Sequence, residues 1–443
     1  MSAARRTLAG LAVLVLALLA FFAWRLLWLP GPLAFAGGQL VSLADYKGAS
    51  PAGVPAELAG ADLVARGKYL TAAADCAACH TVPGGKPFAG GLAFHLPFGT
   101  LYTPNITPDK ETGIGNWSNA DFLRAMHRGI AADGSRLYPA FPYASYTLLT
   151  DDDVLAIRAY LSTLPAVHQP DRPDTFSFPY NQRWLMVFWS GFFNSDTRFH
   201  PVAGRSAEWN RGAYLVEALE HCGECHTPRN LLQARDTRQK FAGGVAEGWN
   251  AYNITSDPVT GVGGWTARAL ASYLSTGFAA GHGSAAGPMN EAVQLSLSQL
   301  APSDIQAIVA YLRTIPPIRA NPPLALAGPA PTLAAEGPTT NPLGKQIFEG
   351  SCASCHSWSG QGAILPAAQL TGTRTVNDPT AVNIVLMVLH GTGAPADGHA
   401  FMPSFASSYT DTEIAAVANY VTARFGAAPS HLTAQDVAKL RKN

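Results

Sequence analysis

The chain has 443 residues, of which 48% are hydrophobic and only 14% are charged. This length favours about two to four domains of about 100–150 residues each. The 30 basic side chains balance 30 acidic ones, which excludes the basic excess of a nucleic-acid-binding protein, and the apolar content excludes a disordered chain. The 42 glycines and 33 prolines indicate many loops, and the positions of the six cysteines must explain their role.

The N-terminal segment predicts a membrane anchor and export of the rest of the chain. Arg5 and Arg6 precede an apolar run over 8–24, and four more apolar residues follow Arg25. The run approaches the ~20 residues of a membrane-spanning helix, and basic residues before it favour a cytoplasmic N-terminus. We therefore expect residues 1–36 to form a signal anchor or transmembrane helix. Cleavage of a signal peptide at Ala34-Phe-Ala36 is the alternative, and both place the remaining chain outside the cytoplasm.

Three copies of one plan follow this segment. Each copy begins with a short predicted helix that holds a glycine and an aromatic residue, continues with Cys-x-x-Cys-His, and closes with an amphipathic helix. The three motifs use all six cysteines: Cys76-Ala-Ala-Cys79-His80, Cys222-Gly-Glu-Cys225-His226 and Cys352-Ala-Ser-Cys355-His356. The closing helices are predicted over 151–161, 303–312 and 411–421, with acidic residues in the first turn and a Thr or Ser as the cap.

The Cys-x-x-Cys-His motif is the attachment signature of c-type haem. Two thiols one helical turn apart can form thioethers with the haem vinyl groups, and the adjoining histidine can bind the iron. The sequence therefore predicts three covalent haems on the six cysteines, with His80, His226 and His356 as axial ligands. A zinc ribbon would need a second cysteine pair near each motif, a redox dithiol would not require the histidine, and such short loops make poor disulfide staples. We expect each axial histidine to donate its other ring nitrogen to a backbone carbonyl.

The second axial ligand can be sought among only five methionines besides Met1. Met289 in copy two and Met402 in copy three lie beside a proline, before the closing helix, eleven or twelve residues after Gly277 and Gly391. A methionine on a loop has little role in packing, so we expect both to bind iron. Ligation by histidine and methionine gives a low-spin haem with a raised potential, suited to electron transfer.

Copy one lacks this methionine. Twelve residues after Gly129 stands Phe141, whose side chain cannot bind iron. The favoured replacement is Met126, on a predicted helix over 121–128. Two alternatives are His127, which lies beside it, and a five-coordinate iron.

These patterns divide the chain into an anchor, three domains, two linkers and a tail. The boundaries are 1–36 for the anchor, 63–167, 206–318 and 339–427 for cytochrome c domains one to three, 168–205 and 319–338 for the linkers, and 428–443 for the tail. The predicted fold is mainly α, with three tandem class I cytochrome c domains after an N-terminal transmembrane helix. The first linker contains Trp184, Phe188 and Phe192 and is too apolar for a free tether, so we expect it to pack on a domain, a partner or the membrane. The second, rich in proline and alanine, predicts a semi-rigid extended segment.

Five segments are specific enough to indicate a family. They are Phe98-Gly-Thr-Leu-Tyr-Thr-Pro-Asn-Ile-Thr-Pro-Asp109, Leu137-Tyr-Pro-Ala-Phe-Pro-Tyr143, Asn181-Gln-Arg-Trp184, Trp209-Asn-Arg-Gly-Ala-Tyr-Leu215 and His221-Cys-Gly-Glu-Cys-His-Thr-Pro-Arg229. From about Leu63 to Gly426 the chain resembles the three-haem cytochrome c subunit of bacterial membrane-bound periplasmic dehydrogenases, of the alcohol, gluconate, sorbitol and fructose/glucose types. It is also similar to the cytochrome subunit of isoquinoline- or aldehyde-type molybdenum oxidoreductases. Phe141 departs from the methionine that the alcohol dehydrogenase branch often carries at this point.

The resemblance implies a non-catalytic electron-transfer subunit on the periplasmic side of the inner membrane. Such a subunit accepts electrons from a dehydrogenase subunit that carries FAD, a quinone cofactor or molybdenum, and passes them through its haems to ubiquinone or a terminal oxidase. Two other functions fit the haem motifs: a haem peroxidase or reductase that uses an open first haem, and a cytochrome subunit of a terminal oxidase. The substrate of the partner cannot be read from this chain.

Overall fold

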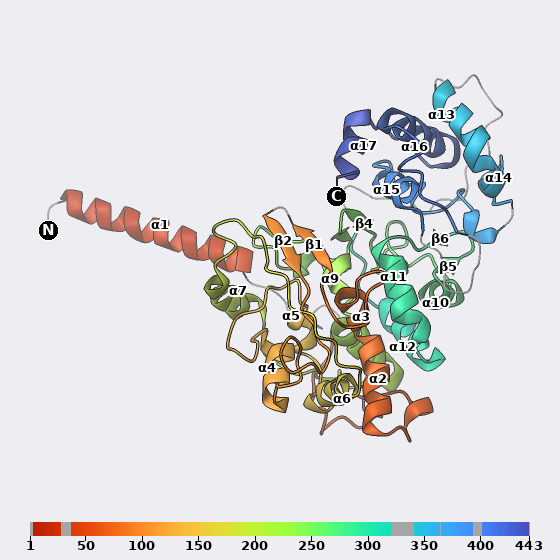
Figure 1. The fold of residues 1–443 in the computed structure, drawn as a ribbon. Helices are drawn as coiled ribbons and strands as arrows, with labels where there is room; N and C mark the ends of the chain where they lie inside the picture. Colours follow the sequence, from red (N-terminus) through yellow and green to blue (C-terminus); the bar gives the residue numbers. More distant parts are fainter. Residues whose placement is uncertain are drawn as a thin grey trace.

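The computed structural model describes residues 3–27, 37–96, 98–319, 341–363, 365–392 and 401–442, so the predicted second linker lies outside the described residues except for Arg319. Helices joined by long loops make up most of this part of the chain (Figure 1). Strands occur in it only as three antiparallel hairpins: β1–β2 (Ala93–Leu96, Gly99–Tyr102), β3–β4 (Gly244–Ala246, Trp249–Ala251) and β5–β6 (Phe278–Ala279, Gly283–Ser284). The predicted mainly α fold is therefore confirmed.

The same pair of crossing helices occurs three times, in a first unit (63–167), a second unit (206–318) and a third unit (341–442). Helix α2 (Leu63–Ala73) packs on α6 (Asp151–Leu161), α8 (Ala207–Tyr214) on α12 (Pro302–Leu312), and α13 (Pro342–Ile347) on α16 (Asp411–Phe425). Glycine allows each close crossing, because a Cβ on Gly67, Gly212 or Gly344 would lie 1.9, 1.9 or 2.3 Å from a carbonyl oxygen of the closing helix.

Shorter helices lie between the two members of each pair. They are α3 (Cys76–His80), α4 (Asn119–Arg128) and α5 (Tyr143–Tyr146) in the first unit, α9 (Gly223–His226), α10 (Ala267–Thr276) and α11 (Pro288–Leu295) in the second, and α14 (Ala353–His356) and α15 (Val382–His390) in the third. Single helical turns are η2 (Ala56–Leu58), η5 (Thr237–Gln239), η6 (Leu297–Gln299) and η8 (Pro366–Ala368).

The closing helices begin as predicted, with one exception. The hydroxyls of Thr150 and Thr410 cap α6 and α16 by accepting a backbone N–H three residues on. In the second unit the predicted serine cap is wrong, since α12 begins at Pro302 and has no side-chain cap. Proline is favoured at the first helical position because it has no N–H that would need a cap. The hydroxyl of Ser303 instead donates to the Glu57 carboxylate at 2.9 Å.

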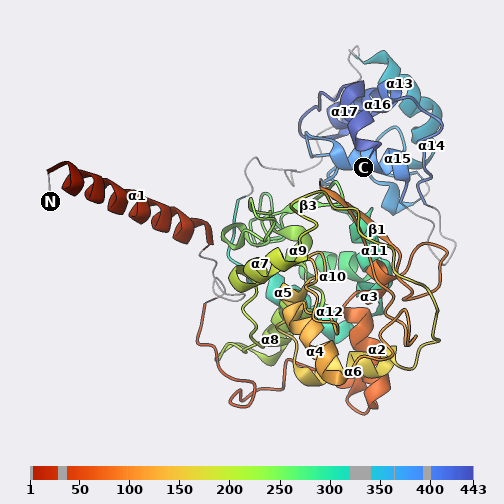
Figure 2. The ribbon, with the colours of Figure 1, turned by 60° about the vertical axis from the view of Figure 1, so that its left-hand side comes forward.

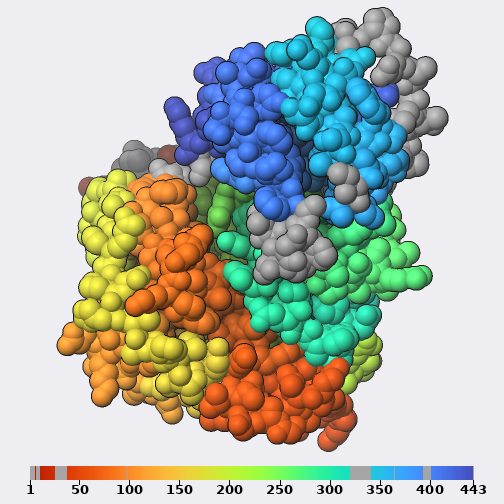
Figure 3. All heavy atoms as spheres, turned by 45° about the vertical axis from the view of Figure 1, so that its right-hand side comes forward, coloured from red at the N-terminus to blue at the C-terminus, as the bar shows by residue number. Residues whose placement is uncertain are grey.

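Buried apolar side chains form two separate cores. The larger core runs through both the first and the second unit, from Leu70 to Ile315, whereas the smaller one belongs to the third unit alone. The third unit stands as its own lobe, coloured blue in Figures 2 and 3. The predicted tail is part of this lobe, because α17 (Ala434–Leu440) buries Val437 in the smaller core.

The first two units contact each other reciprocally. Tyr69 of the first unit donates to Asp304 of the second at 2.7 Å, and the equivalent Tyr214 of the second donates to Asp153 of the first at 2.6 Å. The backbone N–H at the start of each closing helix donates to the same tyrosine hydroxyls, at 3.1 and 3.2 Å. Because each contact occurs in both directions, the two units are related by an approximate two-fold axis, as in an isologous dimer.

The predicted aromatic linker contains the turn η3 (Arg183–Leu185) and the helix α7 (Met186–Phe193). Its first part packs on the first unit, since Phe176 is buried and its ring lies 4.6 Å from that of Tyr138. Five aromatic side chains of the linker remain exposed: Phe178 at 78%, Trp184 at 60%, Phe188 at 58%, Phe192 at 57% and Tyr180 at 48%. The expected packing of the linker on a domain is therefore confirmed for its first part.

The N-terminal helix α1 (Ala3–Leu27) extends away from the rest of the chain (Figures 1 and 2). Its apolar side chains from Leu11 to Trp24 are exposed. Within the described residues, no helix has the length and apolarity of a membrane span. The predicted transmembrane helix over 1–36 is therefore not confirmed.

We predict that Gly212→Ala lowers the thermal unfolding temperature of the purified protein, followed by circular dichroism. The added methyl group would lie 1.9 Å from the Ala307 carbonyl oxygen, and overpacking of this kind costs about 1–3 kcal/mol or more. The control is Gly191→Ala in α7, where nothing lies within 4 Å of the new Cβ and alanine favours the helix. Equal unfolding temperatures for both variants would contradict the close crossing.

Candidate haem-binding sites

Each Cys-x-x-Cys-His motif folds as one short helix at the end of a longer one. The π-helical turns η4 (Leu215–Leu219) and η7 (Phe348–Cys352) lead into the second and third motifs. Asp75 and His221, each directly before a motif, have positive φ values of 50° and 37° that turn the chain sharply. All six cysteines are free thiols with at least partial exposure, so the structure contradicts a disulfide framework and leaves the thiols open to thioether formation.

The three motif histidines are held in the same way. The Nδ1 atoms of His80, His226 and His356 lie 2.8, 2.6 and 2.7 Å from the carbonyl oxygens of Pro104, Tyr252 and Ala368. The expected hydrogen bond to a backbone carbonyl is therefore confirmed in all three units. It assigns the proton to Nδ1 and leaves Nε2 as the nitrogen that can bind iron.

Burial keeps these histidines neutral, as iron ligation requires. Desolvation lowers the pKa of His226 to about 4, and it also lowers the pKa of His80 and of His356. The hydrogen bond to the backbone opposes the shift in each case without cancelling it. A neutral imidazole with a fixed tautomer is the form that a haem iron binds.

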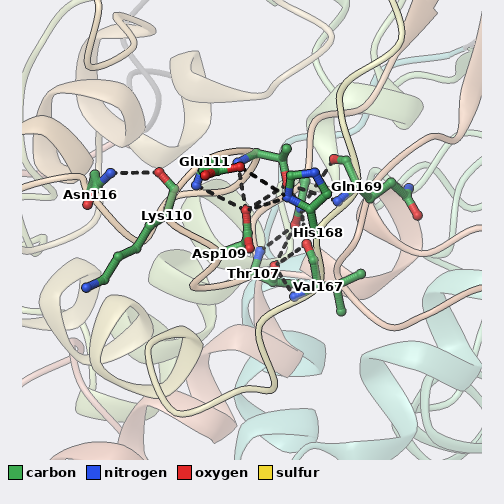
Figure 4. A network of polar contacts seen from close by, with 10 residues as sticks. Thr107, Asp109, Lys110, Glu111, Asn116, Val167, His168 and Gln169 are labelled. Atoms are coloured by element: carbon green, nitrogen blue, oxygen red, sulfur yellow. Dashed lines mark hydrogen bonds and ion pairs between the residues drawn. The ribbon is translucent and has the colours of Figure 1, made fainter.

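A polar network fixes the loop that supplies the carbonyl for His80. Asn105, which follows Pro104, donates to the Val167 carbonyl at 2.7 Å and accepts from the Thr107 backbone N–H at 2.9 Å. Figure 4 shows the contacts of this loop with the segment 167–169: the Val167 N–H donates to the Thr107 hydroxyl, and His168 lies beside Asp109. The second unit repeats the contact, since Asn253 donates to the Ile318 carbonyl at 2.7 Å. The shared Asn-Ile-Thr motif therefore positions the axial histidines.

The three glycines used to align the copies occupy equivalent places. Gly129, Gly277 and Gly391 end α4, α10 and α15, with φ values of 61°, 75° and 74°. The predicted equivalence of these positions is thus confirmed.

The two methionines downstream of these glycines differ in their local structure. Met402 lies on an extended loop, as predicted, where its N–H and C=O both bond Thr392, at 3.1 and 3.0 Å. The predicted loop position of Met289 is wrong, because this residue lies in the first turn of α11, after Pro288. Proline at the first helical position, preceded by Gly287, starts a helix there. Both side chains lie half-buried against the cores.

In the first unit, Met126 is part of the larger core, and Phe141 and Cys76 pack against that core. Met126 is 5% exposed on α4, and the Phe141 ring packs 5.5 Å from that of Tyr146. His127, also buried, turns its Nδ1 towards Asp151 at the start of α6, at 3.8 Å.

The sequence did not indicate a role for two further residues of the second and third units. Trp265 is buried in the second unit, and Arg374 of the third unit donates to the Asn253 carbonyl of the second. The repeated Gly-x-Trp of copies one and two could have identified Trp265. No spacing or motif distinguishes Arg374, because its neighbours come from a different unit.

Comparison with known proteins identifies the family and several relatives of the chain. The cytochrome c family model matches residues 64–165 and 342–424. The fructose dehydrogenase cytochrome subunit of Gluconobacter japonicus is 38% identical over 411 residues, 85% of this chain and 82% of that protein. The gluconate 2-dehydrogenase cytochrome c subunit of Pantoea cypripedii is 38% identical over 399 residues, 86% of this chain and 90% of that protein.

A third relative, a nicotinate dehydrogenase subunit from Pseudomonas putida, is larger. It is 43% identical over 376 residues, which are 83% of this chain but only 31% of that protein. The chain therefore spans about a third of this relative and most of the other two. Because the similarity to the fructose and gluconate dehydrogenase subunits covers more than four fifths of this chain and of each relative, the chain belongs to the family of cytochrome c subunits of bacterial dehydrogenases.

Proposed function

We propose that this chain carries electrons from a dehydrogenase catalytic subunit through three covalent haem c groups to ubiquinone or the respiratory chain. The observation that supports three haems is the repeated site: three motif helices, each with two free thiols and a histidine bonded through Nδ1 to a carbonyl. The three cytochrome c domains would correspond to residues 63–167, 206–318 and 339–427. Bound haem supplies one-electron transfer, and the chain supplies ligation, burial and spacing.

The second axial ligands follow from the helix ends. Met289 and Met402 follow equivalent glycines and lie at the edges of the two cores, so we assign them to the second and third haems. For the first haem we assign Met126, since it shares the apolar core that contacts Cys76, whereas Nδ1 of His127 faces Asp151.

The proposed partner is a dehydrogenase subunit with an FAD, quinone or molybdenum cofactor, on the periplasmic side of a bacterial inner membrane. Support comes from the relatives, which are named as subunits of fructose, gluconate and nicotinate dehydrogenases. We further propose that α1 attaches the chain to the membrane. It is 25 residues long, about 38 Å at 1.5 Å per residue, and its apolar side chains from Leu11 to Trp24 are exposed.

Co-purification tests the proposed function. We expect the full chain, extracted from membranes of its host with mild detergent, to bring a flavin, quinone or molybdenum dehydrogenase with it. The substrate of that dehydrogenase should then reduce the haems, as followed by visible absorption. Isolation with a copper/haem oxidase and no dehydrogenase would contradict the proposal, as would haems that no dehydrogenase substrate reduces.

Substitution by leucine tests the methionine ligands with little change in volume. We predict three low-spin haems in the native protein, and one high-spin, cyanide-binding haem in each of Met126→Leu, Met289→Leu and Met402→Leu, because leucine cannot bind iron. Met387→Leu on α15 serves as the control and should keep three low-spin haems. A test variant that also keeps three low-spin haems would show that its methionine is not a ligand.

Removal of α1 tests the membrane attachment. We predict that a chain whose residues 1–36 are replaced by a cleavable signal peptide keeps its haems but no longer sediments with membranes, because it loses the exposed apolar helix. The control is a chain with α1 intact and with Trp184, Phe188 and Phe192 changed to serine, which should remain in the membrane fraction. Sedimentation of the truncated chain with membranes would contradict the role of α1.

A further inference from the structure

We propose that Arg374 of the third unit and Trp265 of the second together bind a propionate carboxylate of the haem held by His226. The third unit would then help to set the reduction potential of the second haem. This inference rests on the proposed function, in that it requires a haem in the second unit.

Arg374 belongs to the third unit by sequence but makes its contacts with the second. Its side chain is buried, and its Nη1 donates to the Asn253 carbonyl at 3.0 Å while its Nη2 donates to the Thr260 carbonyl. The guanidinium carbon lies 5.4 Å from the centre of the Tyr252 ring. The arginine therefore enters the second unit as a buried positive charge.

This charge has no directly bonded counter-ion among the described residues. No carboxylate lies within ion-pair distance of Arg374 there, and Nε has no hydrogen-bond partner. Asp257 attracts the guanidinium from a longer range, but that carboxylate pairs with Arg319 at 2.9 Å. Burial lowers the pKa of Arg374 to about 10, which leaves the side chain charged at neutral pH. An uncompensated buried charge destabilises the fold, so an anion that completes the site would stabilise it.

A second unpaired donor, the indole N–H of Trp265, is linked to Arg374 through His282. Trp265 is 5% exposed, and its indole N–H has no partner in the described part of the chain. Its ring stacks on that of His282 with a 3.8 Å separation of the ring centres, and the His282 carbonyl accepts a hydrogen bond from the Arg374 backbone N–H at 3.5 Å. Indole and guanidinium N–H groups are donors only, and together they suit a carboxylate.

Arg374 also lies near the axial histidine of the second unit. Tyr252 connects the two, because its carbonyl accepts from His226 and its ring faces Arg374. A haem bound at His226 brings its own carboxylates, the two propionates. Arginine binds carboxylate strongly through paired N–H groups, and a buried positive charge favours the reduced form of a nearby haem.

Contacts around the arginine show that the third unit is positioned for this role. Asn250 and Asn383 exchange hydrogen bonds across the boundary, at 2.8 and 3.0 Å, and Asn250 also donates to Asp378 at 2.9 Å. These contacts hold Asp378 and the first turn of α15 against β4, which leads to Tyr252. Loss of Arg374 therefore need not detach the third unit.

The test is a spectroelectrochemical titration of the full-length holoprotein. The variants are Arg374→Met, which removes the charge, and Trp265→Phe, which removes the indole N–H and keeps an aromatic ring. The control is Arg172→Met, because Arg172 is exposed and stacks 4.1 Å from the centre of the Tyr102 ring in the first unit. The second haem is identified as the one whose reduction wave is missing in a Cys222→Ala/Cys225→Ala variant.

We expect Arg374→Met to lower the midpoint potential of the second haem by about 59 mV or more. This shift corresponds to a tenfold change in the equilibrium constant of a one-electron reduction. Trp265→Phe should give a smaller shift in the same direction, and Arg172→Met should give none. The native midpoint should be the same with and without inorganic phosphate. A midpoint that depends on phosphate would identify a free anion as the occupant and overturn the proposal.

Two further results would overturn it. One is an unchanged second midpoint in an Arg374→Met protein that keeps three haems by mass and its native circular dichroism. The other is a shift confined to the third haem. If the Arg374→Met protein loses haem or does not fold, the Trp265→Phe protein serves as the test. An unchanged midpoint potential of the second haem in Trp265→Phe would then contradict the proposed site. A native protein without haem at Cys222 and Cys225 would instead contradict the proposed function, and the mass spectrum distinguishes that case.

Discussion

The hydrogen bond from each motif histidine to a backbone carbonyl is the contact on which the sites depend. It fixes the tautomer and orientation of the ring, so that Nε2 points away from the protein backbone that holds Nδ1. The loop that provides the carbonyl must be rigid, and in the first two units an asparagine side chain ties it to the segment after the closing helix. The position of the axial histidine therefore depends on the closing helix, through the segment that follows that helix.

The arrangement of cores divides the chain into two bodies. The first and second units share one core and a reciprocal pair of tyrosine–aspartate hydrogen bonds, which suits a rigid pair of haem sites at a fixed separation. The third unit has its own core and meets the second through polar side chains. Such polar interfaces are typical of contacts between domains that fold separately. The proposed role of Arg374 makes this polar boundary part of the second haem site.

Local features of the sequence could be predicted well, because short-range rules determine them. The motif helices, the closing helices and the glycines that end α4, α10 and α15 all follow from spacing and capping. Tertiary features could not be predicted in the same way. The helical position of Met289 depends on Pro288, the tail joins the third core through Val437, and the shared core of the first two units requires knowledge of how they pair. Arg374 carries no local signal, since its partners are more than a hundred residues away.

We propose that one chain carries three covalent haems at three equivalent sites. Mass spectrometry of the purified chain under denaturing conditions tests it most directly, because thioether-bound haem remains attached when the fold is lost. The predicted result is the polypeptide mass plus three haems, with haem-bearing peptides around Cys76, Cys222 and Cys352. A homogeneous chain with two haems or fewer, after expression with a complete haem attachment system, would contradict the account.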